Sequence, residues 1–124
     1  MPWTNDVEEN LKVGLVDVLI LHLLIEEDMY GYQIRQEILK RSDDRIDLKE
    51  GSLYGPFYRL EKKGFIKSYK ILVTGKRYRI YYQITKLGEE YLECALAGFE
   101  NIYYGANKVL KGENNHGNNK KRIE

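Results

Sequence analysis

Residues 51–85 read GSLYGPFYRLEKKGFIKSYKILVTGKRYRIYYQIT, and most of the fold can be predicted outward from them. Residues 51–63 place apolar side chains at helical spacing, and the residue that follows, Gly64, is typical of a glycine that ends a helix. Residues 66–73 and 77–85 alternate in character around a Thr-Gly-Lys turn and are rich in Tyr, Ile and Val. This pattern predicts a β-hairpin directly after the helix.

The predicted helix has two different faces. Leu53, Phe57 and Leu60 fall at i, i+4 and i+7 and are expected to face the core. The opposite face carries hydrogen-bond donors and cations around one glycine: Ser52, Gly55, Tyr58, Arg59 and Lys62. An ordinary solvated face and a face that binds a partner both explain this pattern. The tyrosine and the lack of carboxylates favour the second explanation.

Positive charge is concentrated in the same part of the chain. Residues 49–86 contain ten Lys and Arg but two Glu, a net charge of +8. Residues 1–48 carry −6 and residues 87–124 carry −1, so the chain as a whole is only +1. A solvated surface does not need its charges separated in this way, whereas phosphates attract a cationic face and repel an anionic one. The pattern therefore indicates a nucleic-acid partner.

The second strand of the hairpin also has two faces. One is apolar and the other is basic and aromatic: Tyr78, Ile80, Tyr82 and Ile84 against Arg77, Arg79, Tyr81 and Gln83. A basic edge discourages aggregation between strands, and it also suits a contact with phosphate or the minor groove. We favour the contact with nucleic acid.

The residues before this stretch are predicted to form two helices. Asn5 and Glu8 form a capping box, and the apolar stripe that follows predicts one continuous helix to about Glu26. A second helix is expected from Gly31 to about Ser42. Three helices followed by a hairpin is the order of a winged helix-turn-helix domain, in which the third helix enters the major groove and the hairpin, or wing, lies over the backbone or minor groove.

A long helix is expected after the hairpin, from a cap at Thr85 to Gly112. Its apolar residues fall at alternating spacings of three and four, and we expect them to pair two copies of the chain: Leu92, Ala95, Phe99, Ile102, Ala106 and Val109. Packing on its own domain is the alternative. The predicted fold class is α+β, mainly α, with a winged helix-turn-helix domain (1–85), a dimerisation helix (86–111) and a disordered polar tail (112–124).

Catalysis is not expected. His22 lies in an apolar run and is predicted to be a core residue, and Cys94 is predicted to be a small buried group. His116 lies in the polar tail, and the chain has no paired carboxylates, glycine-rich phosphate loop or Cys/His cluster with usable spacing. No metal or cofactor is therefore expected. A single cysteine and the lack of a long apolar run favour a soluble cytoplasmic protein.

The sequence resembles the PadR family of bacterial transcriptional regulators over roughly residues 11–92. The similar segments occur in the family's order and spacing: 14–21, 30–34, 50–54, 59–66 and 81–88. The resemblance implies a dimeric repressor that binds a roughly palindromic operator and that, in many members, is released by a small molecule. The single long helix after the wing is similar to the short-tailed subgroup, some of whose members take flat aromatic compounds at the dimer interface.

The family pattern and the charges together predict one set of DNA-binding residues: Lys49, Ser52, Tyr54, Tyr58, Arg59, Lys62, Lys76, Arg77 and Arg79. The sequence departs from the family at two places. Gly55 precedes Pro56 where the family has proline directly after the Leu-Tyr pair, so the third helix is expected to bend or to start late. Ile80 replaces a cation in the wing, and Lys76 with Arg77 is expected to compensate.

Two further questions stay open from the sequence. The first is whether an effector cavity exists, with Leu11, Leu15, Phe99, Tyr103 and also Trp3 as candidate lining residues; a simple interface core is the alternative. The second is the kind of partner. A winged helix can also bind an acidic protein, with Tyr58, Arg59 and the wing as the contact surface.

Overall fold

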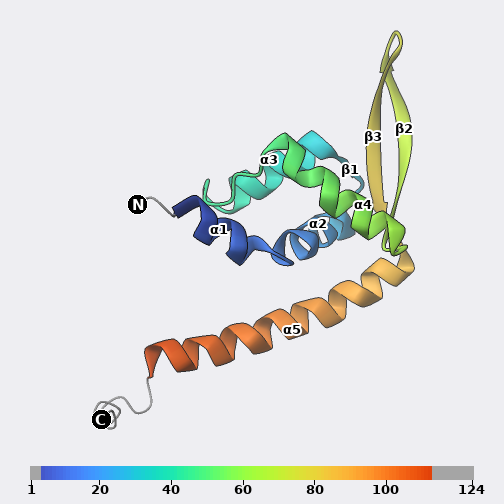
Figure 1. The fold of residues 1–124 in the computed structure, drawn as a ribbon. Coiled ribbons are helices and arrows are strands. Elements are labelled where there is room, and N and C mark those ends of the chain that lie inside the picture. Colours follow the sequence, from blue (N-terminus) through green and yellow to red (C-terminus); the bar gives the residue numbers. More distant parts are fainter. Residues whose placement is uncertain (1–3, 113–124) are drawn as a thin grey trace. The chain divides into compact units, whose positions relative to one another are not determined.

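The computed structural model describes residues 4–112. The elements follow in the order α1 (Thr4–Lys12), α2 (Leu15–Glu26), β1 (Met29–Tyr30), α3 (Gly31–Arg41), the 3-10 helix η1 (Glu50–Leu53), α4 (Tyr54–Lys62), β2 (Ile66–Thr74), β3 (Arg77–Ile84) and α5 (Lys86–Lys111) (Figure 1). The chain divides into two compact units, residues 1–92 and 93–124, which we describe separately. The predicted disordered tail lies outside the described residues except for Gly112.

The core of the first unit lies among helices α2, α3 and α4. The predicted inner face of the third helix is confirmed, because Leu53, Phe57 and Leu60 are all buried. They pack in one cluster with residues from α2, β1, α3, β2, the start of α5 and the loop before η1: Ile20, Leu21, Leu23, Leu24, Met29, Ile34, Ile38, Leu48, Ile66 and Leu92. One apolar cluster therefore fixes α4 against the two helices that precede it.

The N-terminal stretch forms two helices, so the prediction of one continuous helix is wrong. Helix α1 ends at Lys12 and α2 begins at Leu15. Between them Gly14 has a φ of 82°, in the left-handed region that glycine adopts at little cost. The apolar stripe runs across this break, which is why periodicity alone predicted a single helix. As a result, Leu11 is 74% exposed and does not pack in the core.

The three strands form one antiparallel sheet with the order β1-β3-β2. The predicted hairpin is confirmed, and its register runs from Ile66 opposite Ile84 to Thr74 opposite Arg77, with an irregularity between residues 72 and 74. Strand β1 was not predicted, because its two residues are too few to show an alternating pattern. It pairs Met29 with Tyr82 and connects the hairpin to the helices.

Helix α5 starts where it was predicted. The Thr85 hydroxyl accepts a hydrogen bond from the Gly88 amide at 3.1 Å and donates one to the Gly64 carbonyl at 2.6 Å. Gly88 is buried, and a Cβ added there would lie 2.1 Å from the Phe65 carbonyl oxygen. Only glycine therefore permits this close approach between the start of α5 and the segment that joins α4 to β2.

Three side chains do not lie where the sequence predicted. Leu92 was predicted to belong to the dimer seam, but it is 4% exposed and is part of the core of its own chain. His22 was predicted to be a core residue, but its side chain is 55% exposed and lies 4.0 Å from Glu26, because it projects from the outer side of the otherwise apolar helix α2. Cys94 is exposed in this chain.

Candidate nucleic-acid interface

The outward face of α4 is the first part of the candidate interface. Ser52, at the end of the preceding 3-10 helix, is exposed, and so are Tyr54 and Tyr58, at 65% and 64%. Arg59 and Lys62 are exposed on the same helix. The Lys62 ammonium lies 3.5 Å from the Tyr58 hydroxyl and 5.6 Å from the centre of its ring. The helix thus presents hydroxyls and cations together while its other face is buried.

The Gly55-Pro56 departure changes how this helix begins. A 3-10 turn covers residues 50–53, and the α-helix starts at Tyr54, later than the predicted Gly51. Pro56 is the third residue of α4, where an amide has no acceptor within the helix, so the missing N–H costs little. The proline is buried.

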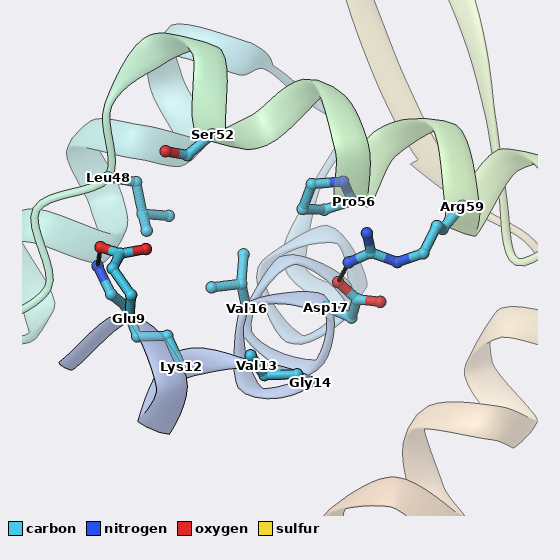
Figure 2. A pocket seen from close by; sticks show the side chains of 10 residues that line it. All are labelled: Glu9, Lys12, Val13, Gly14, Val16, Asp17, Leu48, Ser52, Pro56 and Arg59. Carbon is cyan, nitrogen blue, oxygen red and sulfur yellow. Dashed lines mark hydrogen bonds and ion pairs between the residues drawn. The ribbon is translucent and has the colours of Figure 1, made fainter. Parts of the chain in front are cut away.

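A carboxylate reaches this face from another helix. Asp17 of α2 accepts a hydrogen bond from Arg59, with 2.9 Å between its Oδ1 and the Arg59 Nη2. Both residues line a cavity of about 420 Å³ between the α1–α2 junction and the start of α4, where Ser52 and Pro56 also lie (Figure 2). The sequence prediction missed Asp17, although it is a lone carboxylate in an apolar run, because it is 42 residues from its partner.

The wing, β2–β3, carries the second group of cations. Lys76, Arg77 and Arg79 are exposed, as is Lys49 before α4. Among the described residues, no ion pair involves any of these four or Lys62. Arg79 differs from the others because its guanidinium lies 4.3 Å from the centre of the Tyr30 ring. These cations are thus free of carboxylates within the described part of the chain.

Contacts on both faces of the sheet fix the base of the wing. On one face, Tyr82 stacks on Phe57 of α4 with ring centres 4.0 Å apart. On the other, Tyr81 packs between Tyr30 and Tyr69, at 5.3 and 5.9 Å. Tyr82 therefore holds the wing against α4, and the three tyrosines on the other face join β1, β2 and β3 to one another. The sequence prediction did not identify this aromatic group.

Asp28, just before β1, joins the two strands of the wing at their base. Its carboxylate accepts hydrogen bonds from the Tyr69 hydroxyl and, at 3.3 Å, from the Gln83 side-chain amide. The hydrogen bond to Asp28, with smaller contributions from desolvation and from the nearby negative charge, raises the pKa of Tyr69 to about 12. Burial raises the pKa of Tyr82 on the opposite face.

The candidate effector residues belong to both units of the chain. Leu11 is exposed on α1 and Leu15 is half-buried on α2. Phe99 and Tyr103 stack on each other along α5, with ring centres 6.0 Å apart. Each pair is described within its own unit, so a shared cavity stays a prediction. Trp3 and His116 lie outside the described residues.

Comparison with known proteins identifies the family. The family described as "Transcriptional regulator PadR-like family" matches residues 20–94. The chain belongs to this family. Its members are transcriptional regulators, so the predictions of a PadR relative, a winged-helix fold and a non-enzymatic function are confirmed. No helix in the part of the chain that the structure describes has the length and apolar character needed to cross a membrane.

Several solved PadR-like structures have the same fold. A transcriptional regulator from Clostridium thermocellum is 40% identical, with a TM-score of 0.73 over 80% of this chain and 93% of that one. A PadR family regulator from Clostridium difficile is 33% identical, with a TM-score of 0.64 over 77% and 97%. Bacillus subtilis PadR, solved in complex with operator DNA, is 23% identical, with a TM-score of 0.61 over 66% and 47%, and has the same fold.

Proposed function

We propose that this PadR-like chain is a cytoplasmic, sequence-specific DNA-binding protein that acts as a dimeric repressor. The observation that carries the proposal is a set of exposed cations beside exposed tyrosines on one well-anchored helix and the wing next to it. Lys62, Lys76 and Arg77 have no carboxylate partner among the described residues, and the tyrosines are Tyr54 and Tyr58. Unpaired cations suit phosphates, and hydroxyls can reach base edges.

In the proposed complex, α4 enters the major groove and the wing lies along the backbone. Ser52, Tyr54 and Tyr58 then face base edges, whereas Lys49 and the wing cations face phosphates. Residues 1–85 form the DNA-binding domain in this proposal. The solved complex of Bacillus subtilis PadR with operator DNA supports the choice of partner, because that protein has the same fold.

Dimerisation through residues 86–111 is the second part of the proposal. Helix α5 exposes apolar side chains along its second half: Phe99, Ile102, Tyr103, Val109 and Leu110. Ile102 is 70% exposed and Val109 is 80% exposed. A helix so apolar on one side is stable in water when a partner covers that side. The proposed seam therefore consists of Ala95, Phe99, Ile102, Ala106 and Val109 and starts after the buried Leu92.

Repression follows from occupancy of the operator. A two-fold dimer places two copies of α4 about one helical turn apart and covers a promoter that overlaps the site. An effector acts if it binds better to a dimer whose two α4 helices no longer match that spacing. We propose Leu11, Leu15, Phe99 and Tyr103 as its contacts, and titration of Trp3 fluorescence with planar aromatic compounds tests this. A response that does not saturate for any compound would leave these residues as plain interface core.

The salt dependence of binding follows from the free cations. If Lys49, Lys62, Lys76 and Arg77 each meet one phosphate, a dimer neutralises about eight phosphates, and log affinity falls against log salt with a slope of about −7. Binding of an acidic protein through the same surface is the competing function.

A gel-shift experiment separates the two functions. The duplex lying upstream of the coding sequence is compared with an unrelated duplex of equal length. The proposal predicts a discrete complex with the upstream duplex that survives an excess of the unrelated one. A failure to shift either duplex, even at low salt, would exclude DNA binding and leave the protein-binding function.

A further inference from the structure

Arg59 is an exception among the cations on the outward face of α4. Its side chain is half exposed, at 51%, yet its guanidinium is bound to the Asp17 carboxylate at 2.9 Å. The Asp17 side chain lies on α2 and is only 16% exposed, so the pair draws the Arg59 guanidinium toward α2. Lys62, one turn further along α4, lies beside a tyrosine hydroxyl and forms no ion pair with any residue that the structure describes. The two cations are therefore in different electrostatic environments.

Gly55 leaves open space beside the Arg59 side chain. Gly55 lies one turn before Arg59 on the same face, and a Cβ added at position 55 would lie 3.5 Å from the Arg59 Nη1. The arginine side chain therefore lies back over a residue that has no side chain. A long side chain at position 55 would compete for this space. Gly55, which precedes Pro56 in this chain, therefore lies beside the pair formed by Asp17 and Arg59.

We propose that Asp17 holds Arg59 away from the DNA, so that Arg59 is a positioning residue that ties α4 to α2 and does not contact phosphate. This inference rests on the proposed function, since it concerns which cations of that same surface meet DNA. A phosphate that approached Arg59 would have to displace a partly buried carboxylate and would be repelled by it. Asp17 therefore sets both the orientation of α4 and the number of phosphates that the dimer neutralises.

The test compares the salt slopes of DNA binding for four proteins: unsubstituted, Asp17→Asn, Arg59→Ala and the double variant. Asp17→Asn frees one guanidinium per subunit, so the slope of the dimer becomes steeper by about 1.8, from about −7 to about −9. Arg59→Ala binds more weakly because α4 is less well held, but its slope stays that of the unsubstituted protein. The double variant also returns to that slope, since the freed cation is gone.

A matched control removes a different carboxylate that holds an arginine. Glu26 accepts two hydrogen bonds from Arg41, both at 2.8 Å, and Arg41 lies on α3 and not on α4. Glu26→Gln changes the net charge by the same amount as Asp17→Asn and should leave the slope unaltered. A steeper slope for Asp17→Asn but not for Glu26→Gln assigns the effect to Arg59 and not to the overall charge.

The outcomes are distinguishable. A shallower slope for Arg59→Ala, or an unchanged slope for Asp17→Asn, overturns the inference while the unsubstituted protein still binds DNA. Loss of salt-dependent binding in the unsubstituted protein overturns the proposed function itself, and this inference with it. Thermal unfolding of each variant shows whether it is folded. If Asp17→Asn does not fold, the Arg59→Ala variant decides alone, because the inference requires its salt slope to equal that of the unsubstituted protein.

Discussion

Helix α4 and the wing expose similar side chains, tyrosines and cations, but the protein holds them in different ways. Helix α4 buries Pro56, Phe57 and Leu60 in the common core. Of the nine residues of β2, only Ile66 is buried, and the outer half exposes apolar residues: Ile71, Leu72 and Val73. The helix is fixed along its length, whereas the wing is fixed at its base alone.

This difference suits two kinds of contact. Base edges carry a specific pattern of donors and acceptors, so the side chains that meet them need a rigid support. Phosphates accept a cation from many directions and carry no sequence information, so a ribbon that is fixed at one end is sufficient. We therefore expect substitutions in α4 to alter stability and site preference, and substitutions at the tip of the wing to alter overall affinity.

The largest expected effect lies where the two regions meet. Phe57→Ala removes a buried ring that stacks on Tyr82, and should lower the free energy of unfolding by about 3–5 kcal/mol. Ile80→Ala removes a side chain that is 45% exposed on the wing and should change the free energy of unfolding by less than about 0.5 kcal/mol. Urea unfolding measures both values. Equal losses for the two variants would contradict the difference in anchoring.

Gly88→Ala tests the close contact between the start of α5 and the Phe65 backbone at the base of the wing. The added methyl group would lie 2.1 Å from the Phe65 carbonyl oxygen, which is backbone and cannot rotate aside. We expect a loss of about 1–3 kcal/mol, because such overpacking shifts the backbone. Gly98→Ala on the same helix is the control, since nothing lies within 4 Å of a Cβ there. A Gly88→Ala protein as stable as the unsubstituted one would contradict the close approach.

Site preference and overall affinity should respond to different substitutions. Tyr58→Ala or Ser52→Ala should reduce discrimination between the upstream duplex and a mismatched one by about 1–3 kcal/mol if the side chain reads a base. Competition gel shifts measure this quantity. Unchanged discrimination for both variants would contradict base contacts from α4.

Arg77→Ala should weaken binding to every duplex alike and make the salt slope of the dimer shallower by about 1.8, since two phosphates are no longer neutralised. The effect on affinity is smaller than for a lost base contact and disappears at high salt. Binding titrations at several salt concentrations measure it. An unaltered affinity and slope would show that the wing does not contact the backbone.

The smallest expected effect concerns pH and the base of the wing. The pKa of Tyr69 is raised to about 12, so the neutral hydroxyl is the form that the fold stabilises. That stabilisation is complete below the unfolded pKa of about 10 and is lost as the pH rises through about 12. Asp28→Asn should lower the pKa of Tyr69 towards its ordinary value, which tyrosine absorbance measures during an alkaline titration. The same titration curve in both proteins would contradict the contact.

Much of this structure could be predicted from the sequence, and the failures have physical causes. Alternation and helical spacing located α3, α4 and the hairpin, because one face of each is apolar. The same rule failed at Gly14, where a single backbone angle interrupts a continuous stripe. The sequence prediction also missed the hydrogen bonds between residues that are far apart in the chain. Asp17 and Arg59, like Asp28 and Tyr69, meet only after folding, and no local pattern marks such pairs.

In the proposed complex, a dimer of this chain binds a duplex through the free cations on α4 and the wing. The salt dependence of DNA binding is the most direct test of this interface. The dimer is first verified by light scattering, and its affinity for the upstream duplex is then measured over a series of salt concentrations. We expect log affinity to fall linearly against log salt with a slope of about −7. A monomer, or an affinity that does not change with salt, would contradict the proposed interface.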